Sequence, residues 1–151
     1  MDKGVYALIL ENTHCVVRIG ALGAREFAPG RHVYIGSALG SGGLARASRH
    51  VRLALHRDRP PRWHIDYILL DPHFAPAAVV TAATDRDCEC DLAHVVGGAY
   101  VPGFGCSDCV CHSHLFHRSG DPVPEILAAF RSLDLDARIT RIKNEGGEHR
   151  V

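Results

Sequence analysis

The sequence contains little lysine and carries no net charge. Of the 17 basic residues only Lys3 and Lys143 are lysine, and 17 acidic residues bring the formal net charge to zero. A chain that binds nucleic acid through its overall charge is usually strongly basic. That class of protein is therefore not indicated by net charge, and any basic surface has to be local.

Long apolar runs are absent as well. No stretch approaches the roughly 20 residues of a membrane-spanning helix. The N-terminal MDKGVYALIL has too short an apolar run for a signal peptide, and no small-residue cleavage site follows it. The sequence thus predicts a cytoplasmic protein. In a reducing compartment its six cysteines are expected to be metal ligands, catalytic groups or core residues rather than disulfides, and the isolated Cys15 is expected to be a small core residue.

The chain has the length and composition of one domain. Hydrophobic residues make up 46% of its 151 residues, which is enough to form a core that does not need disulfide bonds. No linker or repeat divides it, so a single domain is predicted over 1–143, with a disordered tail over 144–151.

Apolar periodicity and turn residues predict an α+β fold. Gly20–Gly30 is expected to be a loop, and Thr84 or Asp85 is expected to cap a helix whose core-facing positions are Cys88, Leu92, Val95 and Val96. Strands are expected at 5–10, 15–19, 32–35, 77–83 and 137–142, and helices after Gly43, over 63–70, after Asp85 and over 125–133.

Arginine is concentrated in one segment. Six arginines fall between Arg46 and Arg62, opposed only by Asp58. Such local density suits a phosphate backbone. A solvated arginine-rich face is an equally good interpretation of charge alone.

Five residues of chemical interest follow in a distinctive order. Gly4-Val5-Tyr6 stands on the first expected strand, and Tyr34-Ile35-Gly36 ends a later one. Arg46 and His50 lie four apart and thus share one helix face, and Glu89 falls on the next but one helix. Each residue taken alone is more typical of packing or of a solvated surface, so it is the combination that points to function.

This combination resembles the GIY-YIG endonuclease superfamily. More narrowly, the chain is similar to an uncharacterised GIY-YIG-like (DUF123-type) family, through YIGSA at 34–38, the Arg49-His50 pair, WHIDY at 63–67, Glu89-Cys90 and SDCxCxSHLF at 107–116. The resemblance implies a small central, mostly antiparallel sheet flanked by helices. The long gap between the two tyrosine motifs implies an inserted hairpin.

The resemblance also implies a function, namely metal-dependent hydrolysis of phosphodiester bonds in DNA, with DNA repair as the expected setting. DNA is favoured over RNA as the partner, and a functional link to a DNA-repair glycosylase is implied. Glu89 would hold Mg²⁺ or Mn²⁺, and Arg46 would bind phosphate oxygens. Either Tyr6 or Tyr34 would be the general base, and His50 would hold phosphate or relay a proton. The expected nucleic-acid contacts are Arg49, Arg52, Arg57, Arg59 and Arg62.

His64 and Asp66 form a second polar pair in the WHIDY segment. One interpretation is that they support the site or contact substrate. The other is that they hydrogen bond to each other and fix the local fold. The residue types do not separate the two.

A cysteine and histidine cluster follows Gly105. Cys90, Cys109, Cys111 and His114 would supply the four N or S ligands of a structural Zn²⁺. Cys106-x-x-Cys109 is a competing ligand pair, and reduced thiols without a metal or a redox pair are the alternatives. At the level of the whole chain, the alternatives to a nuclease are a catalytically weak nucleic-acid-binding module on the same scaffold and a thiol redox protein.

Overall fold

The computed structural model describes residues 2–105 and 113–142. Strands and helices alternate in an α+β arrangement, as predicted, and within the described residues β3 and β6 are the two strands that the sequence did not predict. The elements are β1 (Gly4–Asn12), β2 (Cys15–Arg18), a 3-10 turn η1 (Gly20–Leu22), β3 (Ala24–Phe27), β4 (Gly30–Ala38), α1 (Ala45–His56), α2 (His64–Leu69), β5 (Phe74–Ala83), α3 (Glu89–Val96), β6 (Leu115–Arg118), α4 (Val123–Ser132) and β7 (Arg138–Arg141).

Five strands form the main sheet, in the order β6-β4-β1-β5-β7. Each neighbouring pair is antiparallel, which confirms the predicted mostly antiparallel sheet. The strands β2 and β3 pair as a separate two-stranded sheet, so the expected loop over Gly20–Gly30 is wrong where β3 forms. That β2 and β3 are an insertion relative to the GIY-YIG nucleases stays a prediction.

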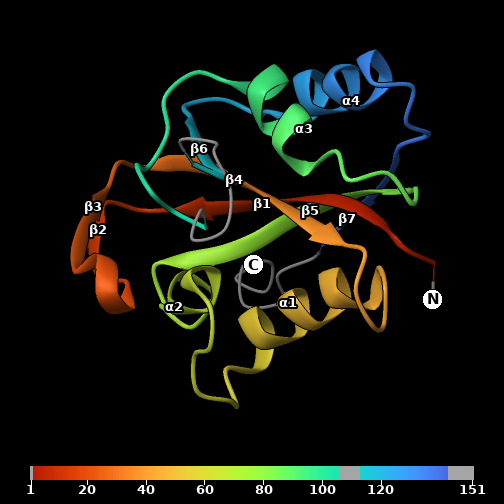
Figure 1. Ribbon diagram of the computed structural model, residues 1–151. Coiled ribbons are helices and arrows are strands. Elements are labelled where there is room, and N and C mark those ends of the chain that lie inside the picture. Colours follow the sequence, from red (N-terminus) through yellow and green to blue (C-terminus); the bar gives the residue numbers. More distant parts are fainter. Residues whose placement is uncertain (1, 106–112, 143–151) are drawn as a thin grey trace.

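Helices cover both faces of the sheet, with α1 and α2 on one face and α3 and α4 on the other (Figure 1). The central strand β1 is consequently buried on both sides. Val5, Ala7 and Ile9 belong to the core beneath α3 and α4, whereas Leu8 and Leu10 pack with α2 and the β2–β3 pair. Two-sided burial explains why β1 reads as a continuous apolar run rather than an alternating one. Among residues 2–105 and 113–142, no helix has both the length and the apolar character to cross a membrane.

The helix α3 begins later than the sequence suggested. Thr84 continues the hydrogen bonding of the sheet, because its N–H donates to the Lys3 carbonyl. Its hydroxyl accepts from the N–H of Arg86 in a local turn. The predicted cap at Thr84 or Asp85 is therefore wrong, and the helix starts at Glu89. Val95, predicted to face the core, is 44% exposed, because the buried face of α3 is centred on Leu92, Ala93 and Val96 and Val95 falls beyond its edge.

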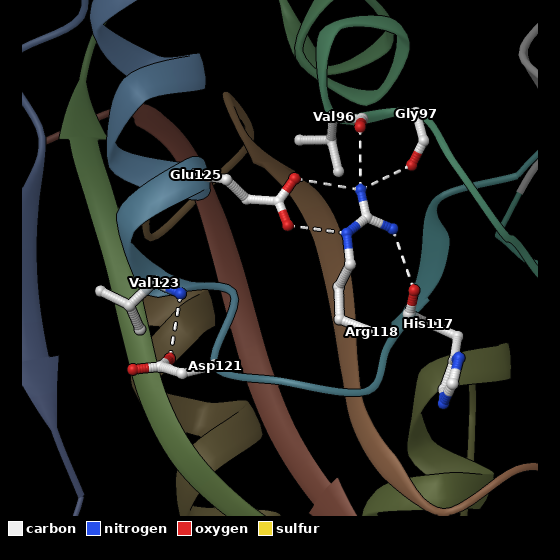
Figure 2. Close-up of polar contacts among 7 residues, drawn as sticks. All are labelled: Val96, Gly97, His117, Arg118, Asp121, Val123 and Glu125. Atoms are coloured by element: carbon white, nitrogen blue, oxygen red, sulfur yellow. Dashed lines mark hydrogen bonds and ion pairs between the residues drawn. The ribbon is translucent and has the colours of Figure 1, made fainter.

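Arg118 joins β6 to the two helices of one layer (Figure 2). Its guanidinium donates to the Glu125 carboxylate of α4 at 2.7 and 3.2 Å, and to the carbonyls of Val96 and Gly97 at 2.9 and 2.8 Å. A cation on the last carbonyls of a helix also favours the helix dipole. Arg118 thereby fixes the C-terminal end of α3, the helix whose first residue is Glu89.

His32 is expected to make the stability of the protein pH-dependent. Its ring is 1% exposed, and its Nδ1 lies 2.8 Å from the Asn12 amide oxygen. Burial, and secondarily His117, lowers the pKa of His32 from 6.5 to about 4. The unfolded chain therefore binds this proton more readily, so stability is fully present above pH 6.5 and falls as the pH drops towards 4. The loss expected from this residue is about 3 kcal/mol, at about 1.4 kcal/mol per pKa unit.

Urea unfolding at a series of pH values from 7 to 4 measures this effect. His32→Gln removes the titrating group and should make the pH dependence shallower than in the wild type. Identical slopes for the two proteins would show that His32 is protonated equally easily in the folded and unfolded states.

Candidate active site

One cavity of about 480 Å³ brings together the five predicted catalytic residues. Tyr6 comes from β1, Tyr34 from β4, Arg46 and His50 from α1, and Glu89 from α3. Four elements far apart in the sequence thus supply two phenols, a guanidinium, an imidazole and a carboxylate to one polar space. The cavity lies on the α1 side of the sheet, and Glu89 reaches it from the first turn of a helix on the other side.

Tyr6 takes its place in the cavity because of Gly36. The two residues are directly paired across β1 and β4. A Cβ added at Gly36 would overlap the Tyr6 ring, so the absence of a side chain lets the phenol lie flat over β4. The second tyrosine motif thus has two roles: Tyr34 lines the cavity, and Gly36 makes room for the first motif's phenol.

Tyr6 and His50 form a buried hydrogen-bonded pair. The Tyr6 hydroxyl lies 2.8 Å from His50 Nε2, and the residues are 1% and 4% exposed. Burial, reinforced by Tyr34, raises the pKa of Tyr6 well above 10.0, although Arg46 acts to lower it. Burial also lowers the pKa of His50 from 6.5 to about 4, with Arg46 and Arg49 adding to the effect and Asp66 opposing it. At neutral pH His50 is therefore uncharged, and its Nε2 accepts a hydrogen bond from the Tyr6 hydroxyl.

Arg46 is half-buried at the edge of the cavity. Its guanidinium donates to the Ser37 carbonyl at 3.4 Å, and its Cζ lies 5.5 Å from the centroid of the Trp63 ring. The end of β4 and an aromatic face therefore orient the guanidinium. An oriented fork of N–H groups in a polar cavity suits a phosphate.

Glu89 lies beside the buried His114. Its Oε2 is 3.2 Å from His114 Nδ1, with side-chain exposures of 23% for Glu89 and 2% for His114. On the other side of the ring, His114 Nε2 lies 3.8 Å from Cys90 Sγ. His114 therefore stands between the predicted metal carboxylate and the adjacent cysteine.

The structure places part of the predicted zinc site together. Cys90 and His114 are neighbours, whereas Cys109 and Cys111, like the competing Cys106, lie outside the described residues, as does the tail over 144–151. Cys90 is disulfide-bonded, so the expectation that no cysteine forms a disulfide is wrong for this residue. Zinc binding stays a prediction.

His64 and Asp66 do not hydrogen bond to each other, so that interpretation is wrong. The Asp66 carboxylate accepts from the backbone N–H groups of Arg62 and Trp63 at 2.8 and 3.1 Å. His64 Nδ1 instead accepts from the Gly105 N–H at 2.9 Å. Asp66 therefore fixes the start of α2, which is a structural role, while His64 lines the cavity.

Four of the five arginines predicted to contact nucleic acid line a second cavity of about 380 Å³: Arg49, Arg52, Arg59 and Arg62. Arg57 does not line it. It ends α1 in a left-handed conformation, with φ 48°, and its guanidinium donates to the Phe74 and Asp71 carbonyls at 3.2 and 3.4 Å. These bonds secure the join between α1 and β5, which is a packing role.

Sequence reasoning missed three features of the site region. It gave no role to Trp63 or Asp87, which line the first cavity, although a solitary tryptophan among arginines is a usable signal. It also treated Cys15 as core alone. Cys15 is buried, yet ligand atoms of Cys15, Asp71 and His73 lie within 4.8 Å of one another. His73 Nδ1 already lies 2.8 Å from the Asp71 carboxylate, so a hydrogen bond accounts for most of this geometry without a metal ion.

Gly36→Ala is expected to destabilise the protein. The added methyl would overlap the Tyr6 ring, and a shift of that ring would disturb its buried hydrogen bond to His50. Overpacking of this kind costs about 1–3 kcal/mol, and urea unfolding measures it. Gly120→Ala is the matched control, since nothing lies within 4 Å of a Cβ at that position. Equal stabilities for the two variants would show that Tyr6 does not depend on Gly36.

Comparison with known proteins gives a family but no activity. A family model described as "Domain of unknown function DUF123" matches residues 5–135, a span that contains the described residues lining both cavities. No curated protein and no solved structure matches the chain.

Proposed function

The chain belongs to the DUF123 family, and we propose that it is a metal-dependent endonuclease of the GIY-YIG type that hydrolyses phosphodiester bonds in DNA. The single observation that carries the proposal is the convergence of Tyr6, Tyr34, Arg46, His50 and Glu89 on one cavity. Packing does not require these five side chains to meet, whereas phosphodiester hydrolysis needs a base, a phosphate anchor and a metal ligand close together.

The phosphate is anchored by donors that keep a fixed protonation state. Arg46 stays charged at any physiological pH. His64 Nδ1 accepts from the Gly105 N–H, so in neutral His64 the proton sits on Nε2, which is free to donate to a phosphate oxygen. Burial lowers the pKa of His64, which favours this neutral donor. Arg46 and His64 would thus hold the scissile phosphate by charge and by a directed hydrogen bond.

Glu89 fits a hard divalent ion. It supplies one carboxylate to a cavity of about 480 Å³, which leaves room for water and for phosphate oxygens. Mg²⁺ is usually held by one or two carboxylates and completes its shell with water and phosphate. When bound, such an ion stabilises negative charge that develops on the phosphate and on the leaving oxygen. His114, 3.2 Å from Glu89, would orient the carboxylate.

Tyr6 and His50 provide a route for the proton of the attacking water. The Tyr6 phenol is neutral at physiological pH and donates to neutral His50. As a water molecule attacks, its proton passes to the Tyr6 oxygen while the phenol proton passes to His50 Nε2. The water oxygen forms the new P–O bond, the bond to the leaving oxygen breaks, and solvent returns a proton to that oxygen. An anionic phosphate in the cavity favours this transfer, because it offsets the repulsion of Arg46 and Arg49 that disfavours protonated His50.

Nicking of supercoiled plasmid tests the proposal. The purified chain should convert supercoiled DNA to relaxed circles in Mg²⁺ or Mn²⁺, and excess EDTA should abolish the conversion. Retained DNA binding without nicking would instead support the second candidate, a nucleic-acid-binding module that keeps the scaffold. The pairing of Tyr6 with His50 favours the nuclease, since a binding module has no use for a buried proton relay.

A further inference from the structure

Trp63 is the one tryptophan of the chain, and it is exposed and yet held in place. The residue is 48% exposed. Its backbone is fixed, because its N–H and that of Arg62 donate to the Asp66 carboxylate at 3.1 and 2.8 Å. Asp66 is itself only 4% exposed. His50 makes a T-shaped contact with the indole, at 6.5 Å between ring centroids and an interplanar angle of 89°. Trp63 is thus a fixed aromatic surface open to solvent.

Two arginine side chains lie close to this ring. The Cζ atoms of Arg46 and Arg62 lie 5.5 and 5.4 Å from the ring centroid. Both distances are within the range of a cation–π interaction. A planar ring flanked by guanidiniums offers a stacking surface and phosphate anchors in the same place. Proteins that bind single-stranded nucleic acid combine these two features.

Trp63 also lines two cavities. The cavity of about 480 Å³ holds the candidate catalytic residues, and the cavity of about 380 Å³ beside it shares Trp63, Arg46, His50 and Arg62 with it. The second cavity adds Arg49, Arg52 and Arg59 to its lining, with Asp58 and Asp66 as its acidic residues. The Asp66 carboxylate already accepts hydrogen bonds from two backbone N–H groups. The side chains left to contact a ligand therefore carry a strongly positive net charge. The second cavity suits an anion carrying a planar group.

We propose that the second cavity binds the nucleotide adjacent to the scissile phosphate, with its base stacked on Trp63 and its phosphate held by Arg49, Arg52 and Arg59. The guanidiniums over the ring move onto the phosphates when the base arrives. A base inside a duplex is already stacked and paired, and releasing it costs least where the base is mismatched or single-stranded. The substrate is therefore DNA with an unpaired base next to the cut. The inference rests on the proposed function, because it takes the first cavity to hold the scissile phosphate.

The fluorescence of Trp63 reports this contact directly, since the chain has one tryptophan. The titrations use excess EDTA, so that binding is measured without cleavage. A short single-stranded oligonucleotide should quench the fluorescence, whereas a blunt duplex of the same sequence should quench it weakly. An oligonucleotide with the same phosphates but abasic sugars should bind with little quenching. Equal quenching by the single strand and the duplex would overturn the inference.

Variants separate stacking from charge. Trp63→Leu should weaken single-strand binding by about 5-fold to 150-fold, the range expected for loss of one stacked base, while duplex binding is almost unchanged; both are measured by anisotropy of a labelled oligonucleotide. Arg59→Ala should weaken binding of the two forms by similar factors and reduce the salt dependence. Leu55→Ala is the control, as Leu55 is exposed and lines neither cavity. An equal loss for single strand and duplex in Trp63→Leu would contradict a stacking role.

These outcomes are distinct from failure of the proposed function. Selective quenching by single strands together with no nicking in Mg²⁺ would leave the nucleotide site in place and remove the nuclease. Nicking that proceeds equally on paired and unpaired DNA, with no quenching of Trp63, would leave the nuclease in place and remove the nucleotide site.

Discussion

Glu89→Gln is expected to lower the cleavage rate of a labelled oligonucleotide by at least about 100-fold. The substitution keeps the shape and the hydrogen-bonding oxygen but removes the charge that holds a divalent ion. Loss of a group that merely supports a metal ligand already costs about 10–100-fold, and loss of the ligand itself should cost more. The fold should remain, because Glu89 is at the first turn of α3 and only partly buried.

Asp91→Asn is the matched control for this variant. Asp91 is an exposed acidic residue of the same helical turn, and it lines neither cavity. Both substitutions change the charge by one and place an amide near the same helix N-terminus. The control should cleave at the wild-type rate. If Glu89→Gln cleaves as fast as Asp91→Asn under saturating Mg²⁺, Glu89 is not the metal ligand.

Tyr6→Phe is expected to lower the single-turnover rate by about 10²–10⁴-fold, the contribution typical of a positioned general base. The variant keeps the ring that packs over Gly36 and deletes the hydroxyl that donates to His50. The buried His50 nitrogen then lacks its donor, at a cost of about 1–3 kcal/mol in stability. The rates should accordingly be compared at a temperature at which thermal unfolding shows both proteins folded.

Tyr67→Phe controls for the loss of a phenol elsewhere. Tyr67 is half-buried on α2 and lines neither cavity, so its variant should retain the wild-type rate. An undiminished rate in Tyr6→Phe would move the role of base to Tyr34, which lines the same cavity. If a higher DNA concentration restores the cleavage rate of Tyr6→Phe, the hydroxyl contributes to DNA binding rather than to the chemical step.

The sheet and its helices were largely predictable because their apolar patterns are local. Strong runs such as 5–10 and 77–83 mark β1 and β5, and the stripe over 125–133 marks α4. The strands β3 and β6 were not predictable in the same way. In β3 only Phe27 is buried, so the strand owes its form to pairing with β2 rather than to its own pattern. The short β6 follows a cysteine-rich segment and is fixed by pairing with β4.

The candidate catalytic set was predictable only through the resemblance to a known superfamily. The residue types and their order pointed to one site, and the structure brings all five to one cavity. The neighbours that contact or act on these residues were not predictable. His114 contacts Glu89 across 25 positions of sequence, and Asp66 influences His50 from another helix. Arg57 shows the opposite limit. Its charge grouped it with the arginines predicted to contact nucleic acid, whereas the structure places it at the end of α1, bonded to backbone carbonyls.

The most direct test of the central claim is a cleavage reaction in water labelled with the heavy isotope of oxygen. A short DNA substrate with an unpaired base is incubated with excess wild-type chain and Mg²⁺ for a single turnover, and the terminal phosphate of the product is analysed by mass spectrometry. Hydrolysis predicts one labelled oxygen in that phosphate, and Glu89→Gln, purified in parallel, should give no product. Absence of product from the wild type, or equal product from Glu89→Gln, would contradict the assignment of this cavity as a phosphodiester-hydrolysing site.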